Sequence, residues 1–188
     1  MSSVVSTNRV VIASRAPDLR MMRFFNPVIR ALLRSPLHGL LSGQILLLTY
    51  TGRRSGRQYT LPVGYVRDGD ALLVVSQHSE LKRWWRNLRG DVPVAVLLCG
   101  QRVNARADVI ENPTAVAAEV ERLIARLGAR EASRQLYMGL DVTPRPTREQ
   151  LAQALPGVVV VRITPQRLPM HVGTQRNQEI EYVKQPTH

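Results

Sequence analysis

A short run of glycine and arginine residues is the part of this sequence best equipped for chemistry. Residues 49–57 read Thr-Tyr-Thr-Gly-Arg-Arg-Ser-Gly-Arg, with Gly52 and Gly56 four residues apart. Glycine lets a backbone turn tightly and approach a ligand closely, and arginine presents a planar fork of donors that matches phosphate or carboxylate. The run therefore predicts a binding loop for an anionic ligand. The alternative is a solvated hairpin tip whose arginines only keep the protein soluble.

Two apolar segments that flank this loop are expected to hold it between strands. The run 45–48 enters the loop, and the run 59–66 leaves it. The Asp-Gly-Asp sequence at residues 68–70 then favours a tight turn, because Asp and Gly tolerate turn conformations. The segments that we expect to be strands are 44–51, 58–67, 71–76, 91–98, 102–110 and 158–163. Their succession is typical of an antiparallel meander rather than of a βα repeat.

Helical patterns surround these strands. The clearest spans residues 113–127, where Asn112 is a suitable N-cap, Pro113 fits the first helical position and Gly128 is a stop signal. Shorter helices are expected at 81–88, 130–138 and 148–155, and two more within 17–34, separated at Asn26-Pro27. We therefore predict a mainly antiparallel β fold of about six strands, with N-terminal helices and a helical insert before the last strand.

The length of 188 residues suits one domain with its own core. We expect an irregular N-terminus over residues 1–16, a single domain over 17–164, and a polar tail over 165–188. The tail is punctuated by proline and lacks periodicity.

The net charge of +12, with a pI near 11.2, favours anionic partners. Arginines interleave with apolar residues over 17–41, so this segment is a candidate for peripheral membrane contact, or it covers the open side of the β domain. The arginines are spread along the chain without a recognition motif, which argues against nucleic acid. Residues 1–15 resemble no secretory signal, and no apolar run reaches about 18 residues, so we expect a cytoplasmic protein, with membrane association left open.

Several kinds of catalytic site are absent from the sequence. It has no Gly-x-Ser-x-Gly elbow and no His-Glu-x-x-His pair, and the loop at 52–56 lacks the Lys-Ser/Thr of a P-loop. The four histidines are scattered without carboxylates at ligand spacing, so no metal site is expected. Cys99 is the only cysteine, which excludes an intramolecular disulfide.

Two longer blocks carry a resemblance to a known family. They read LLLTYTGRRSGRQYTLPVGYVRDGDALLVVSQ and RWWRNLRGDVPVAV, within residues 40–110. Together they resemble the deazaflavin-dependent nitroreductase and quinone reductase family, a branch of the flavin/deazaflavin oxidoreductases. The resemblance implies a split β-barrel like that of FMN-binding proteins, with coenzyme F420 in a groove. It also implies hydride transfer from the reduced coenzyme to a small-molecule acceptor such as a quinone, a nitroaromatic or a similar electron-poor compound.

The resemblance also implies roles for individual residues. The residues matched to cofactor binding are Arg53, Arg54, Ser55, Gly56, Pro62, Val75, Ser76, Gln77, Trp84 and Asn87. Of these, the arginines and Ser55 would meet the phosphate and acidic tail of the coenzyme, whereas Trp84 would buttress the groove. Tyr137 and Ser76 are the catalytic candidates. With an ordinary pKa near 10, Tyr137 would be a proton donor or an orienting group rather than a base.

The chain departs from the family pattern at two places. Tyr59 stands where an arginine is usual, and the run Ser-Gln-His-Ser at 76–79 replaces Ser-Lys-Gly-Gly. Arg57, Lys82 and Arg83 are candidates to replace the lost charge. The departures keep FMN, FAD or haem open as alternative cofactors, and with them non-catalytic binding of a flavin, haem or lipid-like molecule. A membrane-surface or nucleic-acid binder is the third option, and both a monomer and a homodimer remain open.

Overall fold

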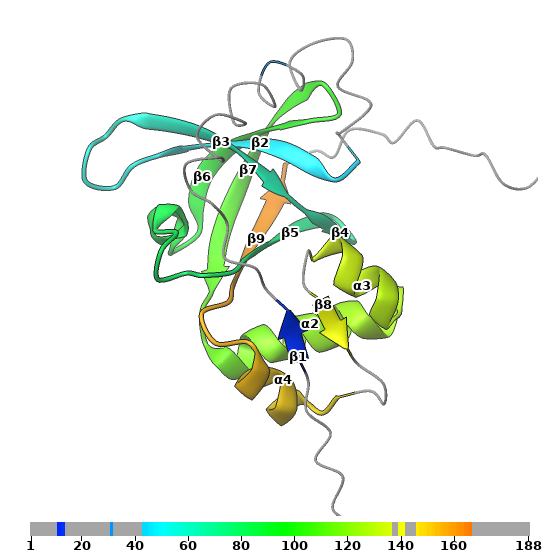
Figure 1. Ribbon diagram of the computed structural model, residues 1–188. Coiled ribbons are helices and arrows are strands. Elements are labelled where there is room, and N and C mark those ends of the chain that lie inside the picture. The colour runs from blue at the N-terminus through cyan, green and yellow to red at the C-terminus, as the bar shows by residue number, and fades with distance from the viewer. Residues whose placement is uncertain (1–10, 14–30, 32–42, 137–138, 142–145, 167–188) are drawn as a thin grey trace, which may run out of the picture.

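A seven-stranded antiparallel sheet forms the centre of the molecule (Figure 1). The computed structural model describes residues 11–13, 31, 43–136, 139–141 and 146–166. The strands of this sheet are β2 (Ile45–Thr51), β3 (Gln58–Gly64), β4 (Val66–Asp68), β5 (Ala71–Ser76), β6 (Val92–Leu98), β7 (Gln101–Ile110) and β9 (Val159–Pro165). They are ordered β3-β2-β6-β7-β9-β5-β4, and every neighbouring pair is antiparallel. The predicted fold class is confirmed.

The sheet curls because its two edge strands are almost continuous in the chain. β3 and β4 lie at opposite edges of the sheet, yet only Tyr65 separates them. The edges must therefore meet at Tyr65, whose backbone N–H donates to the carbonyl of Gln44 at 3.0 Å. The result is the expected split barrel. A single strand over 58–67 was predicted, and that detail is wrong because the chain changes from one edge to the other there.

Two interior strands of the sheet, β5 and β9, are buried on both faces. In β5, Leu72 and Val74 belong to the core inside the barrel, whereas Leu73 belongs to a second core between the sheet and the helices. In β9, Val161 points to the first core and Val160 to the second. Successive strand residues face opposite sides, so burial of both faces explains why the runs 71–75 and 159–161 are continuously apolar rather than alternating.

Three helices cover the second face of the sheet (Figure 1). They are α2 (Pro113–Leu127), α3 (Ala129–Gln135) and α4 (Arg148–Ala154). The side chain of Asn112 caps α2 by accepting from two backbone N–H groups, and Thr147 and Gln150 form a capping box at α4. The helical insert before the last strand is thus confirmed, although α3 ends at Gln135 rather than at 138.

The helix expected at 81–88 is shorter than predicted. The carbonyl of His78 accepts from the backbone N–H groups of Leu81 and Lys82, each at 3.0 Å, and this separate turn occupies the first residues. The 3-10 helix η2 (Trp84–Leu88) begins only after it.

A second, two-stranded sheet was not predicted. It pairs β1 (Val11–Ala13) with β8 (Gly139–Asp141), so the irregular structure expected for residues 1–16 is wrong at these three positions. A three-residue strand is too short to show an alternating pattern, and its partner is far away in the sequence.

Several predictions fall on residues outside those described. They are the N-terminal helices, the basic segment 17–41 as a membrane contact, and most of the tail 165–188; the domain boundaries also stay predictions. In the part of the chain that the structure describes, no helix is long and apolar enough to cross a membrane.

Candidate functional site

The basic loop, residues 52–57, forms a closed turn at the tip of the β2–β3 hairpin. The backbone N–H of Gly52 donates to the carbonyl of Arg57 at 2.8 Å, and the N–H of Gly56 donates to the carbonyl of Gly52 at 2.9 Å. Gly56 has a φ of 63°, a left-handed conformation that favours glycine. The glycines therefore close the loop on itself, as the sequence predicts.

Tyr59 fixes this loop from one side. Its ring stacks on Tyr50 with 5.7 Å between centroids, and its hydroxyl lies 3.1 Å from Ser55 Oγ. A Cβ added to Gly52 would lie 2.7 Å from the Tyr59 ring, closer than side chains normally pack. Tyr59, which stands where the family resemblance leads us to expect an arginine, thus supports the loop by contact instead of by charge.

Asn87 connects the basic loop to η2. Its Oδ1 accepts from the backbone N–H of Arg53 at 3.0 Å, and its Nδ2 donates to the carbonyl of Trp84 at 2.9 Å. The side chains of Arg53, Arg54 and Arg57 are exposed, and within the described residues no carboxylate pairs with them. Their charges are therefore available to an anion from outside the protein.

A cavity of about 450 Å³, here the first cavity, lies next to this region between β3, the end of β5 and the segment that leads into η2. The predicted site residues in its wall are Pro62, Val75, Ser76, Gln77 and Trp84. The structure thus brings together residues that are up to 22 positions apart in the sequence. Arg53, Arg54, Ser55, Gly56 and Asn87 lie outside the wall, and Asn87 joins the loop to it through Trp84.

Ser76 is the chemically unusual residue of the wall. It is 3% exposed, and its hydroxyl has no hydrogen-bond partner among the described residues. Buried polar groups are nearly always satisfied, and leaving one unpaired costs about 1–3 kcal/mol. A ligand with a polar atom at this point of the cavity would remove that cost.

Gln77 braces the wall rather than replacing the missing lysine. Its Nε2 donates to the carbonyl of Leu136 at 3.3 Å, which ties the end of β5 to the end of α3. This side chain therefore helps to hold the cavity in shape.

Lys82 is the cation that the cavity contains. It is half-buried in the wall, and burial lowers the pKa of its ammonium group. The turn at His78, which has a φ of 56°, brings it there. Arg57 and Arg83, the other two candidates to replace the lost charge, are exposed and outside the wall. The sequence shows three candidate cations, but it does not show the turn at His78 that places only Lys82 in the cavity wall.

The two adjacent tryptophans differ in their surroundings. Trp84 is half-buried in the cavity wall. Trp85 is 4% exposed, donates from Nε1 to the carbonyl of Ser79 at 3.3 Å, and lies against the guanidinium groups of Arg86 and Arg89. Trp84 is thus available to a ligand, whereas Trp85 is part of the core.

Tyr137, the predicted proton donor, lies outside the described residues. The wall also contains residues that the sequence did not single out, among them Tyr65 and Gln135. Burial raises the pKa of Tyr65, and a nearby Cys99 adds to this effect. Tyr65 could not be recognised from the sequence, because it reads as one more apolar position of a continuous strand.

The arrangement fits a ligand with an apolar or aromatic body and an anionic arm. Aromatic and aliphatic side chains with a few polar groups are typical walls for such a body. The arginines of the basic loop, which pair with no carboxylate in the described part of the chain, suit phosphate or carboxylate groups.

Comparisons with known proteins find a family model and several solved structures to which this chain is similar. A family model described as F420H(2)-dependent quinone reductase matches residues 21–143. Among solved structures, HutZ, the heme storage protein from Vibrio cholerae, is 16% identical, with 71% of this chain and 91% of that chain covered and a TM-score of 0.41. A structure named F420 Reductase is 14% identical, with coverages of 73% and 93% and a TM-score of 0.36. Curated proteins yield no match. The similarities to these two solved structures are too low to support an argument about function.

Proposed function

This chain belongs to the F420H(2)-dependent quinone reductase family, so it is an oxidoreductase that depends on coenzyme F420, and we propose that it reduces a quinone, a nitroaromatic or a similar electron-poor acceptor. The observation that carries the proposal is the buried, unpaired hydroxyl of Ser76 in an apolar cavity beside the unpaired arginines of the basic loop. When bound, the coenzyme supplies the hydride, and the protein supplies orientation and electrostatics.

The basic loop would hold the anionic arm of the coenzyme. The guanidinium groups of Arg53 and Arg54 are exposed, and charge-assisted bonds to phosphate or carboxylate are stronger than neutral ones. Ser55 and Gly56 form the turn that presents these arginines, and Tyr59 and Asn87 keep that turn in place.

The first cavity would hold the ring system. Pro62, Val75 and Trp84 give it apolar surfaces, and the Ser76 hydroxyl can hydrogen-bond a polar ring atom. Lys82 adds a positive charge at the wall. Because the wall is largely apolar, a bound ring system would displace water from the reacting surface. Tyr137 remains our proposed proton donor to the reduced acceptor.

The test is a fluorescence titration of the purified chain with oxidised coenzyme F420, with FMN, FAD and haem in parallel. We expect binding of coenzyme F420 in the micromolar range, typical of enzyme ligands, and weaker binding in Arg54→Ala. Arg102→Ala, which changes an exposed arginine on β7, is the matched control. Turnover is then measured with reduced coenzyme and a neutral quinone. Tight binding of a flavin or haem, with neither binding nor oxidation of the deazaflavin, would contradict the proposal.

A further inference from the structure

A second cavity of about 420 Å³ adjoins the first. Tyr65 and Gln135 line both cavities and form their common wall. Three arginines, Arg67, Arg126 and Arg134, line the second cavity, whereas the first has apolar surfaces over most of its wall. The second cavity therefore suits a charged group next to an apolar ligand site.

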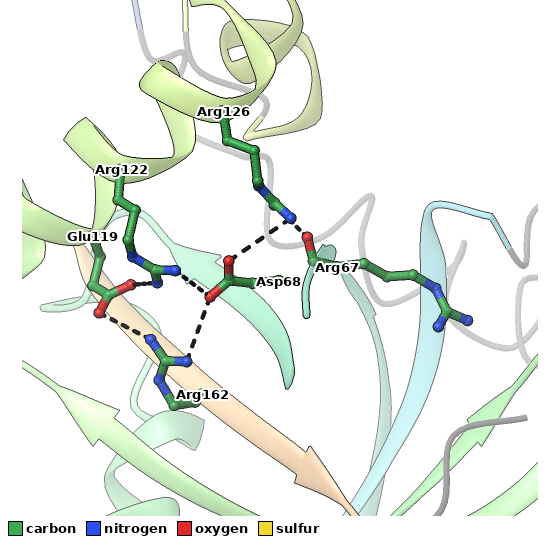
Figure 2. A network of polar contacts seen from close by, with 6 residues as sticks. All are labelled: Arg67, Asp68, Glu119, Arg122, Arg126 and Arg162. Carbon is green, nitrogen blue, oxygen red and sulfur yellow. Dashed lines mark hydrogen bonds and ion pairs between the residues drawn. The ribbon is translucent and has the colours of Figure 1, made fainter. Parts of the chain in front are cut away.

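Positive charge exceeds negative charge in the cluster beside this cavity (Figure 2). Asp68 pairs with Arg122 at 2.6 Å, with Arg162 at 3.5 Å and with Arg126 at 3.8 Å. Glu119 pairs with Arg122 and Arg162. We call these five residues the Asp68 cluster. With Arg67 included, the residues of Figure 2 are four arginines and two carboxylates, a net charge of +2.

Arg67 is the arginine of Figure 2 that pairs with no carboxylate among the described residues. Figure 2 shows its side chain extending away from Asp68, while its carbonyl accepts a hydrogen bond from Arg126. Its guanidinium contacts the Tyr65 hydroxyl, but its Nη2 is buried without a hydrogen-bond partner among the described residues. A guanidinium cannot lose its charge in a protein, and a buried donor without a hydrogen-bond partner costs free energy, more so when it belongs to a charged group. An anion in the second cavity would remove that cost.

The position of Arg67 indicates which anion this would be. β3 starts beside the basic loop at Gln58 and ends at Gly64, about 20 Å away at about 3.3 Å per residue. Tyr65 and Arg67 follow at that far end. The basic loop thus lies at one end of β3 and Arg67 at the other, with the first cavity along the strand between them. One compact anionic group cannot contact both the basic loop and Arg67.

We propose that Arg67 and Arg126 form a subsite for an anionic substituent of the acceptor, such as a carboxylate, phosphate or sulfonate. This inference rests on the proposed function, in which the basic loop takes the anionic arm of the coenzyme and the first cavity takes its ring system, and it adds that the acceptor shares the first cavity with that ring. The acceptor lies with its electron-poor ring in the first cavity, and its anionic group reaches past Tyr65 and Gln135 to Arg67.

The test measures binding without coenzyme, by calorimetry, at constant ionic strength. The probes are 1,4-naphthoquinone-2-sulfonate and neutral 1,4-naphthoquinone. We expect Arg67→Met to raise the dissociation constant of the sulfonate about tenfold, as loss of one charge-assisted hydrogen bond would, and to leave that of the neutral quinone unchanged. Arg130→Met, an exposed arginine on α3, should change neither. If Arg67→Met does not fold, Arg126→Met tests the same subsite.

Equal effects of Arg67→Met on both quinones, or none on the sulfonate, would overturn the inference. Inorganic phosphate that binds through Arg67 while the sulfonate does not would assign the subsite to a free anion and overturn the acceptor role. The binding assay contains no coenzyme and therefore tests the subsite alone. The proposed function is tested separately, by turnover: it would be contradicted if the wild-type chain failed to oxidise the reduced coenzyme with either quinone.

Discussion

Two groups of arginines in this chain differ in what surrounds them. Those of the basic loop are exposed and lack carboxylate partners among the described residues. Those of the Asp68 cluster share two carboxylates and join β4, β9 and α2 (Figure 2). The same type of side chain thus serves a ligand in one region and the fold in the other, and Arg126, which pairs with Asp68 at 3.8 Å and also lines the second cavity, is the one member of the Asp68 cluster to which we assign both roles. What distinguishes them is the placement of acidic residues, not the density of positive charge.

The ionisation of the Asp68 carboxylate shows how strongly it interacts with the arginines of the cluster. Its side chain is 9% exposed, and burial opposes its ionisation. The hydrogen bond from Arg122 and the charges of Arg122, Arg126 and Arg162 outweigh burial and lower the pKa of Asp68. The carboxylate therefore stays ionised at neutral pH, and the cluster acts as a fixed ionic contact between sheet and helix.

The largest effect should come from removing the loop charges. The double variant Arg53→Ala/Arg54→Ala loses two charge-assisted contacts, each contributing about 1.5 kcal/mol, so the dissociation constant of coenzyme F420 should rise about a hundredfold. Its melting temperature should stay the same, because exposed arginines without ion pairs contribute little to stability. Fluorescence titration and thermal unfolding measure the two quantities. An unchanged dissociation constant would contradict the ligand role of the loop.

The converse result is expected in the Asp68 cluster. Asp68→Asn leaves three arginines around a neutral amide and should lower the free energy of unfolding by about 2 kcal/mol, below the range for fully buried pairs because the arginines are partly exposed. Urea denaturation measures this change. The affinity for coenzyme F420 should not move; a loss of affinity without a loss of stability would make this cluster part of the coenzyme site.

The shape of the basic loop should matter less than its charge. In Gly52→Ala the added methyl would meet Tyr59 and Ser55 Oγ, each at 2.7 Å, and displace the loop. We expect an affinity for coenzyme F420 about tenfold lower, equivalent to about 1.4 kcal/mol. Gly43→Ala is the matched control, since nothing lies within 4 Å of its added Cβ. Equal affinities in the two variants would show that the loop adapts to its ligand.

Lys82 should give the smallest effect, through pH. Its charged form attracts an anion, and burial lowers its pKa below the ordinary 10.5, so affinity for coenzyme F420 should fall as pH rises through that lowered value. We expect a decrease of about threefold, typical of a partly exposed charge pair. Lys82→Gln should show the lower affinity at every pH. If the affinity of Lys82→Gln for coenzyme F420 also fell about threefold as pH rises, another group would be responsible for the pH dependence.

Much of the fold follows from patterns within single segments. The apolar runs of β5 and β9, the cap at Asn112 and the stop at Gly128 are local signals, and the structure agrees with them. The break at Tyr65 is different, because it depends on the meeting of two sheet edges. No property of residues 58–67 alone shows that the chain must leave one edge and join the other.

The candidate site divides in the same way. The basic loop is visible in the sequence because its glycines and arginines are adjacent. The cavity is not visible as a local pattern, because its wall combines β3, β5 and the turn before η2. Only the family resemblance points to wall residues such as Pro62, Ser76 and Trp84, and only the turn selects Lys82 over Arg57 and Arg83. The Ser76 hydroxyl is unpaired because no hydrogen-bonding group of the described residues lies next to it in space, and a sequence cannot show this.

The most direct measurement is a crystal structure of the chain with oxidised coenzyme F420. The account predicts the deazaflavin ring in the first cavity, with Ser76 Oγ within hydrogen-bond distance of a ring polar atom and the anionic arm against Arg53 and Arg54. The second cavity should be free of the coenzyme. An anionic arm bound at Arg67, or a ring outside the wall formed by Pro62, Ser76 and Trp84, would contradict it.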